Sequence, residues 1–125
     1  MPATAQLLED SLLLIWNDRD ADRRLALMPR VYAPDMAFFE SNTGPAIVGY
    51  AAINALITQL QVGWAPDFVF SLSQPAQVNH QVQHVAWTLG APGQPPVASG
   101  MDVALVAEER IVALHLFLDA VPSAA

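Results

Sequence analysis

The sequence predicts a cone-shaped α+β barrel, with about three N-terminal helices packed on a curved mixed, mostly antiparallel sheet. Apolar residues repeat every three to four positions in the first third of the chain and form strand-like runs in the second half. The connections between the later runs are short, which favours antiparallel pairing. Helices grouped ahead of such strands indicate an α+β domain. A chain of 125 residues without a linker or repeat fits a single domain, 1–125.

Two helices are expected before residue 32. The first opens at Thr4 or Pro2 and runs to about Asn17, because its apolar residues share one side and its acidic residues the other. The second begins near Ala21 after a polar break, and Pro29 inside it predicts a kink or an early end. Its candidate N-cap residues are Asp20 and Asp22.

A third helix is expected over 50–60, and strands make up the rest of the predicted domain. Pro and Gly breakers separate the extended segments, and Ala33-Pro34-Asp35 is expected to turn the chain into the first of them. The expected strands cover residues 36–40, 47–48, 68–72, 78–89, 97–106 and 111–118.

Composition excludes several classes of function. The net charge is −7, there is no Lys, and the few Arg residues form no basic patch, which argues against nucleic acid and anionic membranes as partners. The absence of Cys excludes disulfides, thiolate metal sites and cysteine nucleophiles. The first five residues do not resemble a signal peptide, and the longest apolar run, 12–16, is too short to span a bilayer. We therefore expect a cytoplasmic protein.

Two carboxylates stand out because they lie in apolar surroundings. Glu40 closes the apolar run 36–39, and Asp102 interrupts the run 101–106. Carboxylates are seldom buried unless they are paired or their pKa is raised, and a desolvated carboxylate can act as an acid or base near neutral pH. Alternatively, each residue ends a strand or points to solvent, as every second side chain does in a sheet with one wet face.

The order of elements and several short motifs resemble the nuclear transport factor 2-like superfamily, and within it the SnoaL-like polyketide cyclases, with ketosteroid isomerases as cousins. The motifs are degenerate one by one, but their order and spacing cover nearly the whole chain. They are Leu27 with Val31-Tyr32-Ala33-Pro34-Asp35, Gly49-Tyr50-Ala51-Ala52-Ile53, Ala86-Trp87-Thr88-Leu89-Gly90, Gly100-Met101-Asp102, Arg110-Ile111-Val112 and Leu116-Phe117-Leu118-Asp119.

The resemblance implies roles for the same two carboxylates. Glu40 matches the general base of ketosteroid isomerases, and Asp102 matches the aspartate that stays protonated there and donates a hydrogen bond to the oxyanion. An aspartate similar to Asp102 is the acid or base in SnoaL-like cyclases. The helix-1 tyrosine of the isomerases falls near Ser11 here and is missing. Limonene epoxide hydrolases carry an Arg where this chain has Gly100, which argues against epoxide hydrolysis.

Further candidates come from the strands and the aromatic residues. His115 is a third candidate catalytic residue, since it shares a strand face with Asp119 and imidazole titrates near neutrality. A core or interface histidine is the alternative. Ligand pockets and plain cores use the same aromatic residues. The candidate substrate-binding residues are Trp16, Tyr32, Phe38, Trp64, Trp87, Phe117 and Asp119.

Two other groups of side chains are assigned no chemistry. His80 and His84 are four residues apart in an expected strand, where they are too distant to share one metal ion. Four arginines lie among aspartates around the second helix and are interpreted as a solvated helix face: Arg19, Arg23, Arg24 and Arg30.

Two functions fit these observations. The first is an enzyme without a cofactor that moves protons as an isomerase, cyclase or dehydratase on a hydrophobic carbonyl compound. The second is a non-catalytic ligand-binding or assembly module with the same pocket. A cavity that reaches both Glu40 and Asp102 would favour the enzyme. Both faces of the expected sheet carry apolar residues, which predicts a homodimer through the convex face, with Gln81 or Gln83 and His80 or His84 at its margin.

Overall fold

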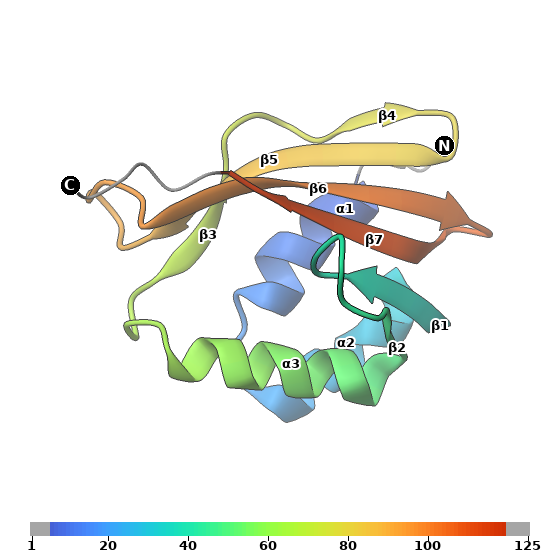
Figure 1. Cartoon of the computed structure of the whole chain (residues 1–125), viewed down its shortest axis with the longest axis horizontal. Coiled ribbons are helices and arrows are strands. Elements are labelled where there is room, and N and C mark those ends of the chain that lie inside the picture. Colours follow the sequence, from blue (N-terminus) through green and yellow to red (C-terminus); the bar gives the residue numbers. More distant parts are fainter. Residues whose placement is uncertain (1–5, 120–125) are drawn as a thin grey trace.

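The computed structural model describes residues 6–119, so the expected helix start at Thr4 or Pro2 lies outside the described residues. Three helical segments and one sheet make up the domain (Figure 1). The elements are α1 (Gln6–Asp10) with its continuation η1 (Ser11–Trp16), α2 (Ala21–Val31), β1 (Tyr32–Phe39), β2 (Ile47–Val48), α3 (Tyr50–Val62), β3 (Val69–Leu72), β4 (Gln77–Asn79), β5 (Val82–Gly90), β6 (Ala98–Ala107) and β7 (Arg110–Leu118). No helix among residues 6–119 is long and apolar enough to cross a membrane.

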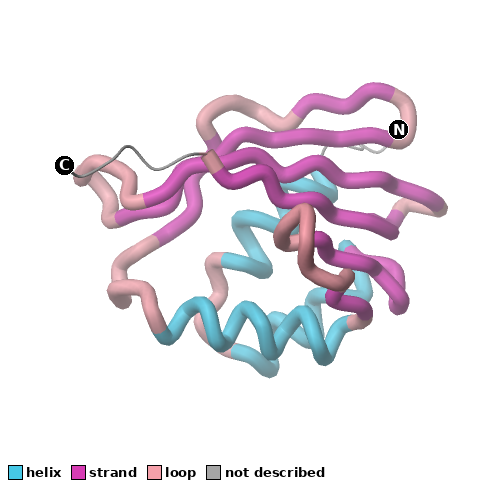
Figure 2. Tube along the Cα trace, in the orientation of Figure 1, coloured by secondary structure: helices cyan, strands magenta, loops and turns pink. Residues whose placement is uncertain are grey.

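The strands form one curved, open sheet in the order β2-β1-β7-β6-β5-β3, with β4 paired to β5. Every pairing is antiparallel except β1 with β7, so the sheet is mixed and mostly antiparallel, as predicted. The helices lie on one side of it (Figure 2). We call the helix-covered side the inner face and the opposite side the outer face.

The helices follow the predicted order with two local differences. The first helix ends at Trp16, and its last part, η1, is a π-helix, a rare conformation that often marks functional sites. Asp20 caps α2 by accepting a 3.0 Å hydrogen bond from the backbone N–H of Arg23. Of the kink or early end expected at Pro29, the early end is wrong, because α2 continues to Val31. The carbonyl of Pro29 accepts a 2.6 Å hydrogen bond from Arg110, which holds this helix end near β7.

The predicted boundaries of two strands are also wrong. The segment Ala33-Pro34-Asp35 is part of β1 and not a turn, and the pairing of β1 with β7 shifts register across it. The long strand expected over 78–89 is a hairpin of β4 and β5, reversed at His80, which has a positive φ of 54°. The sequence gives little sign of this reversal, because no Gly or Pro stands at the turn and only three consecutive polar residues, Asn79, His80 and Gln81, mark it.

Alternation along β5 and β6 sorts their side chains between the two faces. Val85, Trp87 and Leu89 are buried on the inner face, and β6 places Asp102 and Ala104 beside them. The helices cover this face with apolar side chains from all three helical segments. The residues of the core with zero exposure include Leu8, Ile15, Met28, Tyr32, Met36, Ile53, Ile57, Ile111 and Leu114.

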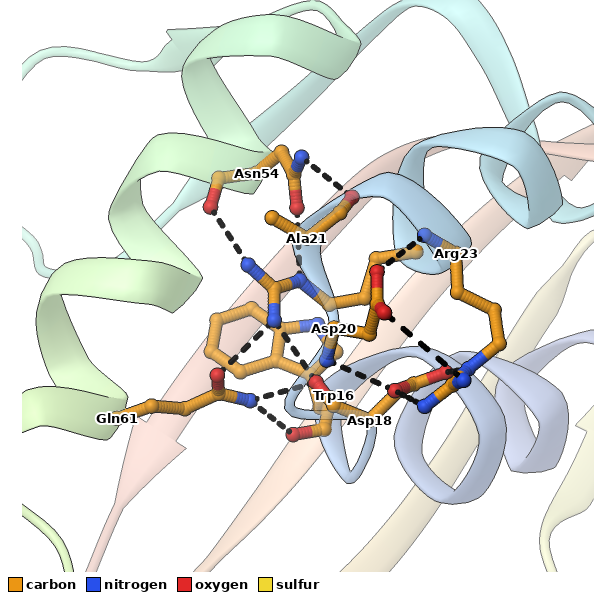
Figure 3. A network of polar contacts seen from close by, with 8 residues as sticks. Trp16, Asp18, Asp20, Ala21, Arg23, Asn54 and Gln61 are labelled. Carbon is orange, nitrogen blue, oxygen red and sulfur yellow. Dashed lines mark hydrogen bonds and ion pairs between the residues drawn. The ribbon is translucent and has the colours of Figure 1, made fainter.

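Arg24 is buried, so its interpretation as part of a solvated helix face is wrong. Its side chain is 1% exposed, and its guanidinium donates hydrogen bonds to Asn54 on α3 at 2.7 Å and to Gln61 at 2.9 Å. It also donates to the Asp18 carbonyl at 2.8 Å, to the hydroxyl of Thr58 and to the Asn54 carbonyl. These neutral acceptors satisfy the five N–H groups of the guanidinium. Figure 3 shows Asn54 and Gln61 of α3 gathered here with Asp18 of the loop before α2.

The buried guanidinium gives a stability prediction. Arg24→Lys should lower the free energy of unfolding by roughly 2–4 kcal/mol, because an ammonium has three donors and leaves buried acceptors unpaired. Urea unfolding of the variant measures this change. The matched control is Arg23→Lys, since Arg23 is 69% exposed in its ion pair with Asp18. That control should change stability by less than about 1 kcal/mol. Equal effects of the two substitutions would contradict the importance of the buried network.

Candidate active site

A cavity of about 240 Å³ lies between the helices and the inner face of the sheet. Aromatic and aliphatic side chains make up most of its wall, and its carboxylates are Glu40 and Asp102. Among residues 6–119, no Arg, Lys or His lines it. The full lining is Leu12, Trp16, Phe38, Glu40, Leu60, Trp64, Phe70, Trp87, Leu89, Ala98, Asp102, Leu116 and Leu118.

Asp102 is the buried acid of this cavity. It lies in the middle of β6 and is 6% exposed, which confirms the burial expected from its apolar neighbours. The indole Nε1–H of Trp87 donates a 3.1 Å hydrogen bond to Oδ1 of Asp102. Burial raises the pKa of Asp102 from 3.8 to about 7, and the hydrogen bond from Trp87 opposes that rise. The carboxyl group is therefore able to hold or release a proton near neutral pH.

Glu40 reaches the same cavity from a different setting. It follows the last residue of β1 and is exposed, so it lies where the cavity meets solvent. One continuous cavity thus touches both carboxylates, which is the arrangement that an enzyme with two acid–base groups requires.

Aromatic rings contact one another around the cavity. Trp16 and Phe38 lie with ring centroids 5.5 Å apart, and Phe70 meets Trp87 edge to face at 5.1 Å and Trp64 at 5.4 Å. Four of these residues were predicted, whereas Phe70 was not. The observation that could have identified Phe70 is the alternation of side chains along β3, because Phe70 is buried while Val69 and Ser71 on either side of it are exposed.

The remaining unpredicted lining residues are aliphatic, and the pairing of the strands explains two of them. Leu116 is paired with Asp102, and Leu89 lies two residues after Trp87 on the same face of β5. The other residues of this group are Leu12, Leu60, Ala98 and Leu118. The sequence does not distinguish such residues from ordinary core positions.

Tyr32 is buried in the core and does not line the cavity, contrary to its predicted contact with substrate. Its hydroxyl lies 2.5 Å from the hydroxyl of Ser11 and accepts a 3.2 Å hydrogen bond from the indole of Trp16. Burial raises the pKa of Tyr32, and the charge of Asp102 adds a smaller effect in the same direction. Tyr32 therefore holds Trp16 in the cavity wall from behind.

Three predicted site residues lie away from the cavity. Leu116 is paired with Asp102 on the inner face, so His115 and Phe117 point to the outer face. His115 is exposed there and stacks on Phe39, with ring centroids 4.5 Å apart. Asp119 is exposed and accepts a 2.7 Å hydrogen bond from Ser99. The prediction had the face of β7 reversed, because both of its faces carry apolar residues.

The histidine pair of the β4–β5 hairpin also lies outside the cavity. His80 is in the turn and His84 is on the outer face of β5. Within residues 6–119, no group of three His, Cys, Asp or Glu side chains is arranged to hold a metal ion.

The proteins that resemble this chain are found among solved structures. No family model matches it, and a search of curated proteins finds no match either. A proposed isomerase of the SnoaL-like family from Agrobacterium tumefaciens is 26% identical, with a TM-score of 0.77 over 94% of this chain and 95% of the other. A proposed ketosteroid isomerase from Kribbella flavida gives 15% identity and a TM-score of 0.70, over 98% of this chain and 82% of the other.

A proposed SnoaL-like polyketide cyclase from a Jannaschia species is similar as well, with 15% identity and a TM-score of 0.73 over 93% of this chain and 85% of the other. The chain has the nuclear transport factor 2-like fold. The resemblance seen in the sequence is thereby confirmed for the architecture. Within this fold, the cavity between helices and sheet is the concave site where a ligand can be enclosed.

The raised pKa of Asp102 predicts a dependence of stability on pH. The folded state keeps the proton to about pH 7, whereas the unfolded chain releases it near 3.8. This group therefore stabilises the fold least above pH 7, and stability falls as the pH rises through that window. The shift corresponds to at most roughly 4 kcal/mol.

Asp102→Asn removes the titration and keeps an oxygen that can accept from Trp87. Its free energy of unfolding, measured in urea from pH 4 to 8, should exceed that of the wild type increasingly as the pH rises. Glu40→Gln removes an exposed carboxylate and should not reproduce this pattern. Parallel pH curves for wild type and Asp102→Asn would contradict the raised pKa.

Proposed function

We propose that the protein is an enzyme that transfers protons next to the carbonyl of a hydrophobic small molecule, as an isomerase, cyclase or dehydratase. The observation that carries this proposal is Asp102, a buried acid with a pKa of about 7 inside an aromatic cavity that also reaches Glu40. A group whose pKa lies near the working pH is the most effective general acid or base.

The burial of Asp102 and the exposure of Glu40 indicate a different catalytic role for each carboxyl group. Asp102, kept protonated by burial, donates a hydrogen bond to the carbonyl oxygen and stabilises the negative charge that develops on it. Glu40, in contact with solvent, takes the proton from the neighbouring carbon and returns it at the product position. Ketosteroid isomerases divide the work between two carboxyl groups in the same way, so the assignment of roles is by analogy with them.

The cavity also restricts the substrate. Its volume of about 240 Å³ exceeds the roughly 150 Å³ that accommodates benzene, which fits a compact compound of one or two rings. In the described part of the chain, two carboxylates and no basic side chain line it, so an anionic substrate would meet repulsion without a counter-charge. We infer an uncharged, compact carbonyl compound with an aromatic or alicyclic body.

The similar structures support this reaction class. The neighbour with 26% identity is described as a proposed isomerase, and the other two as a proposed ketosteroid isomerase and a proposed polyketide cyclase. Ketosteroid isomerisation is a proton transfer next to a carbonyl, which is the reaction class proposed here. Since one fold hosts many functions, the support comes from the residues in the cavity as much as from the fold.

Deuterium exchange at the carbon next to the carbonyl of 2-tetralone, followed by NMR in D₂O, tests the proposal without knowledge of the natural substrate. The wild type should accelerate exchange. Asp102→Leu should reduce the rate by about 10²–10³-fold, because a donor to the enolate oxygen is lost. Glu40→Gln should reduce it by about 10²–10⁴-fold, because the base is lost.

The matched control is Glu109→Gln, which removes an exposed carboxylate in the turn between β6 and β7 and should leave the rate unchanged. Binding of 2-tetralone without faster exchange in the wild type would sink the enzymatic proposal in favour of a ligand-binding module. Binding is observable by fluorescence, since all three tryptophans of the chain line the cavity.

We further propose that the outer face joins two copies of the chain. Val82, Leu105 and Phe117 on this face are 42%, 45% and 58% exposed. Met101 and Val103 lie half-buried between them. A patch of this kind usually marks an interface, and two-fold dimers are the commonest assembly. Of the polar residues expected at its margin, Gln83 is instead buried on the inner face, where it accepts a hydrogen bond from the Leu8 N–H.

Light scattering at micromolar concentration should give twice the mass of one chain. Phe117→Glu should reduce that mass to one chain, because it places a charge in the apolar patch. Val62→Glu changes a side chain that is 83% exposed at the end of α3 and should leave the dimer intact. A wild-type mass equal to one chain would rule out this assembly.

A further inference from the structure

The hydrogen bond between Trp87 and Asp102 depends on how β5 and β6 are paired. Trp87 lies directly opposite Gly100, and Asp102 is two residues further along β6 on the same inner face. The indole therefore reaches diagonally across the strand pair, a distance that a long aromatic side chain can bridge. Its Nε1–H ends 3.1 Å from Oδ1 of Asp102.

Gly100 provides the space for this arrangement. A Cβ atom at position 100 would lie 2.7 Å from Cζ2 and 3.1 Å from Cη2 of the Trp87 ring, and 2.7 Å from the carbonyl oxygen of Phe117. The indole thus lies against the backbone of β6, where any side chain at Gly100 would displace it. The glycine is required by the close approach of the ring and not by its backbone conformation, since φ is not positive there.

The two oxygens of Asp102 consequently differ. The indole N–H can only donate, so Oδ1 accepts this hydrogen bond, which favours the acidic proton on Oδ2 because the unprotonated oxygen is the better acceptor. Among residues 6–119, the one fully buried side-chain nitrogen or oxygen without a partner is Nδ1 of His84. Oδ2 of Asp102 has no hydrogen bond to the described residues and is not fully buried, and it is the carboxyl oxygen left available to a ligand in the cavity that Asp102 lines.

We propose that Trp87 is a positioning residue which, in the space left by Gly100, holds Oδ1 of Asp102 and thereby presents the proton on Oδ2 to the ligand. This inference rests on the proposed function, in which Asp102 is the acid that meets the carbonyl oxygen. Trp87 acts through Asp102 and fixes both the rotamer of the carboxyl group and the oxygen that carries the proton.

Few other ionisable groups face Asp102. On the inner face its neighbours are Val85 and Trp87 of β5 and Leu116 of β7. The helices contribute Leu12, Trp16 and Leu60 to the same cavity. Of the titratable groups, Tyr32 of β1 interacts with Asp102 electrostatically and Glu40 shares the cavity. No basic side chain of the described residues lines the cavity, and within the same part of the chain the indole of Trp87 is the hydrogen-bond donor to this carboxyl group.

Carbon-13 NMR of the aspartate side-chain carboxyl carbons tests the proposal in the free protein. In the wild type, Asp102 should titrate near pH 7, and the indole N–H resonance of Trp87 should shift with the same midpoint. Trp87→Phe keeps a ring but removes the donor to the ionised carboxylate, so the pKa of Asp102 should rise by about one unit. Trp16→Phe is the matched control, because the Trp16 N–H is donated to Tyr32 and not to Asp102. It should leave the midpoint within about 0.3 units.

Gly100→Ala provides a second variant with both residues of the pair intact. The added methyl group should displace the indole, so the Trp87 N–H should no longer follow the titration of Asp102. If this variant does not fold, Trp87→Phe and the wild-type indole titration still decide the question. An unchanged Asp102 midpoint in Trp87→Phe, or a wild-type Trp87 N–H that is insensitive to pH between 5 and 9, would overturn the proposal.

The exchange of 2-tetralone separates this inference from the proposed function. If Trp87 positions the acid, Trp87→Phe should lower the exchange rate by about tenfold and move the alkaline limb of its pH profile upward. If Trp87 and Asp102 titrate together but the protein does not accelerate exchange, the proposed enzymatic function is rejected and the positioning of Asp102 by Trp87 is retained. Exchange activity with no coupling would reject the positioning role and keep the enzyme.

Discussion

The buried guanidinium of Arg24 holds the helical layer together, and the cavity wall depends on that layer. It joins α2 to Asn54 and Gln61 on α3 and to the loop before α2. Gln61 then donates to the carbonyl of Trp16 at the end of η1. A charged group surrounded by neutral acceptors is costly to bury, so the network tolerates few alternative arrangements. Trp16 is fixed in the cavity wall by this network from one side and by Tyr32 from the other.

The second constraint is that Asp102 is desolvated without a cationic partner. When this carboxylate is ionised above neutral pH, its burial lowers the stability of the folded state. Ionisable groups with such perturbed pKa values are common at functional sites. The indole of Trp87 reduces this cost without neutralising the group, because its N–H hydrogen-bonds the ionised form. The fold thus keeps an acid whose protonation changes near neutrality, where a fully paired carboxylate would remain charged.

Features that depend on neighbouring residues in the chain were predictable from the sequence, and features that depend on residues far away in the chain were not. The N-cap at Asp20 and the burial of Asp102 follow from neighbours in the chain, and both are seen in the structure. Arg24 looked like a surface residue because its acceptors Asn54 and Gln61 lie 30 or more positions away. The face of His115 was misjudged because β7 is apolar on both sides, and only its pairing with β6 shows which side meets the helices.

The sequence by itself determined the fold class, the order of the elements and the two carboxylates of the cavity, because hydrophobic periodicity and turn residues act over short distances. Only the tertiary structure decided which side chains enclose the cavity, that Tyr32 stands behind its wall, and that Gly100 makes room for Trp87 beside Asp102. These features arise from strand register and helix packing between segments far apart in the chain. A shift of one residue in that register reverses every side chain, and single-strand patterns do not specify it when both faces are apolar.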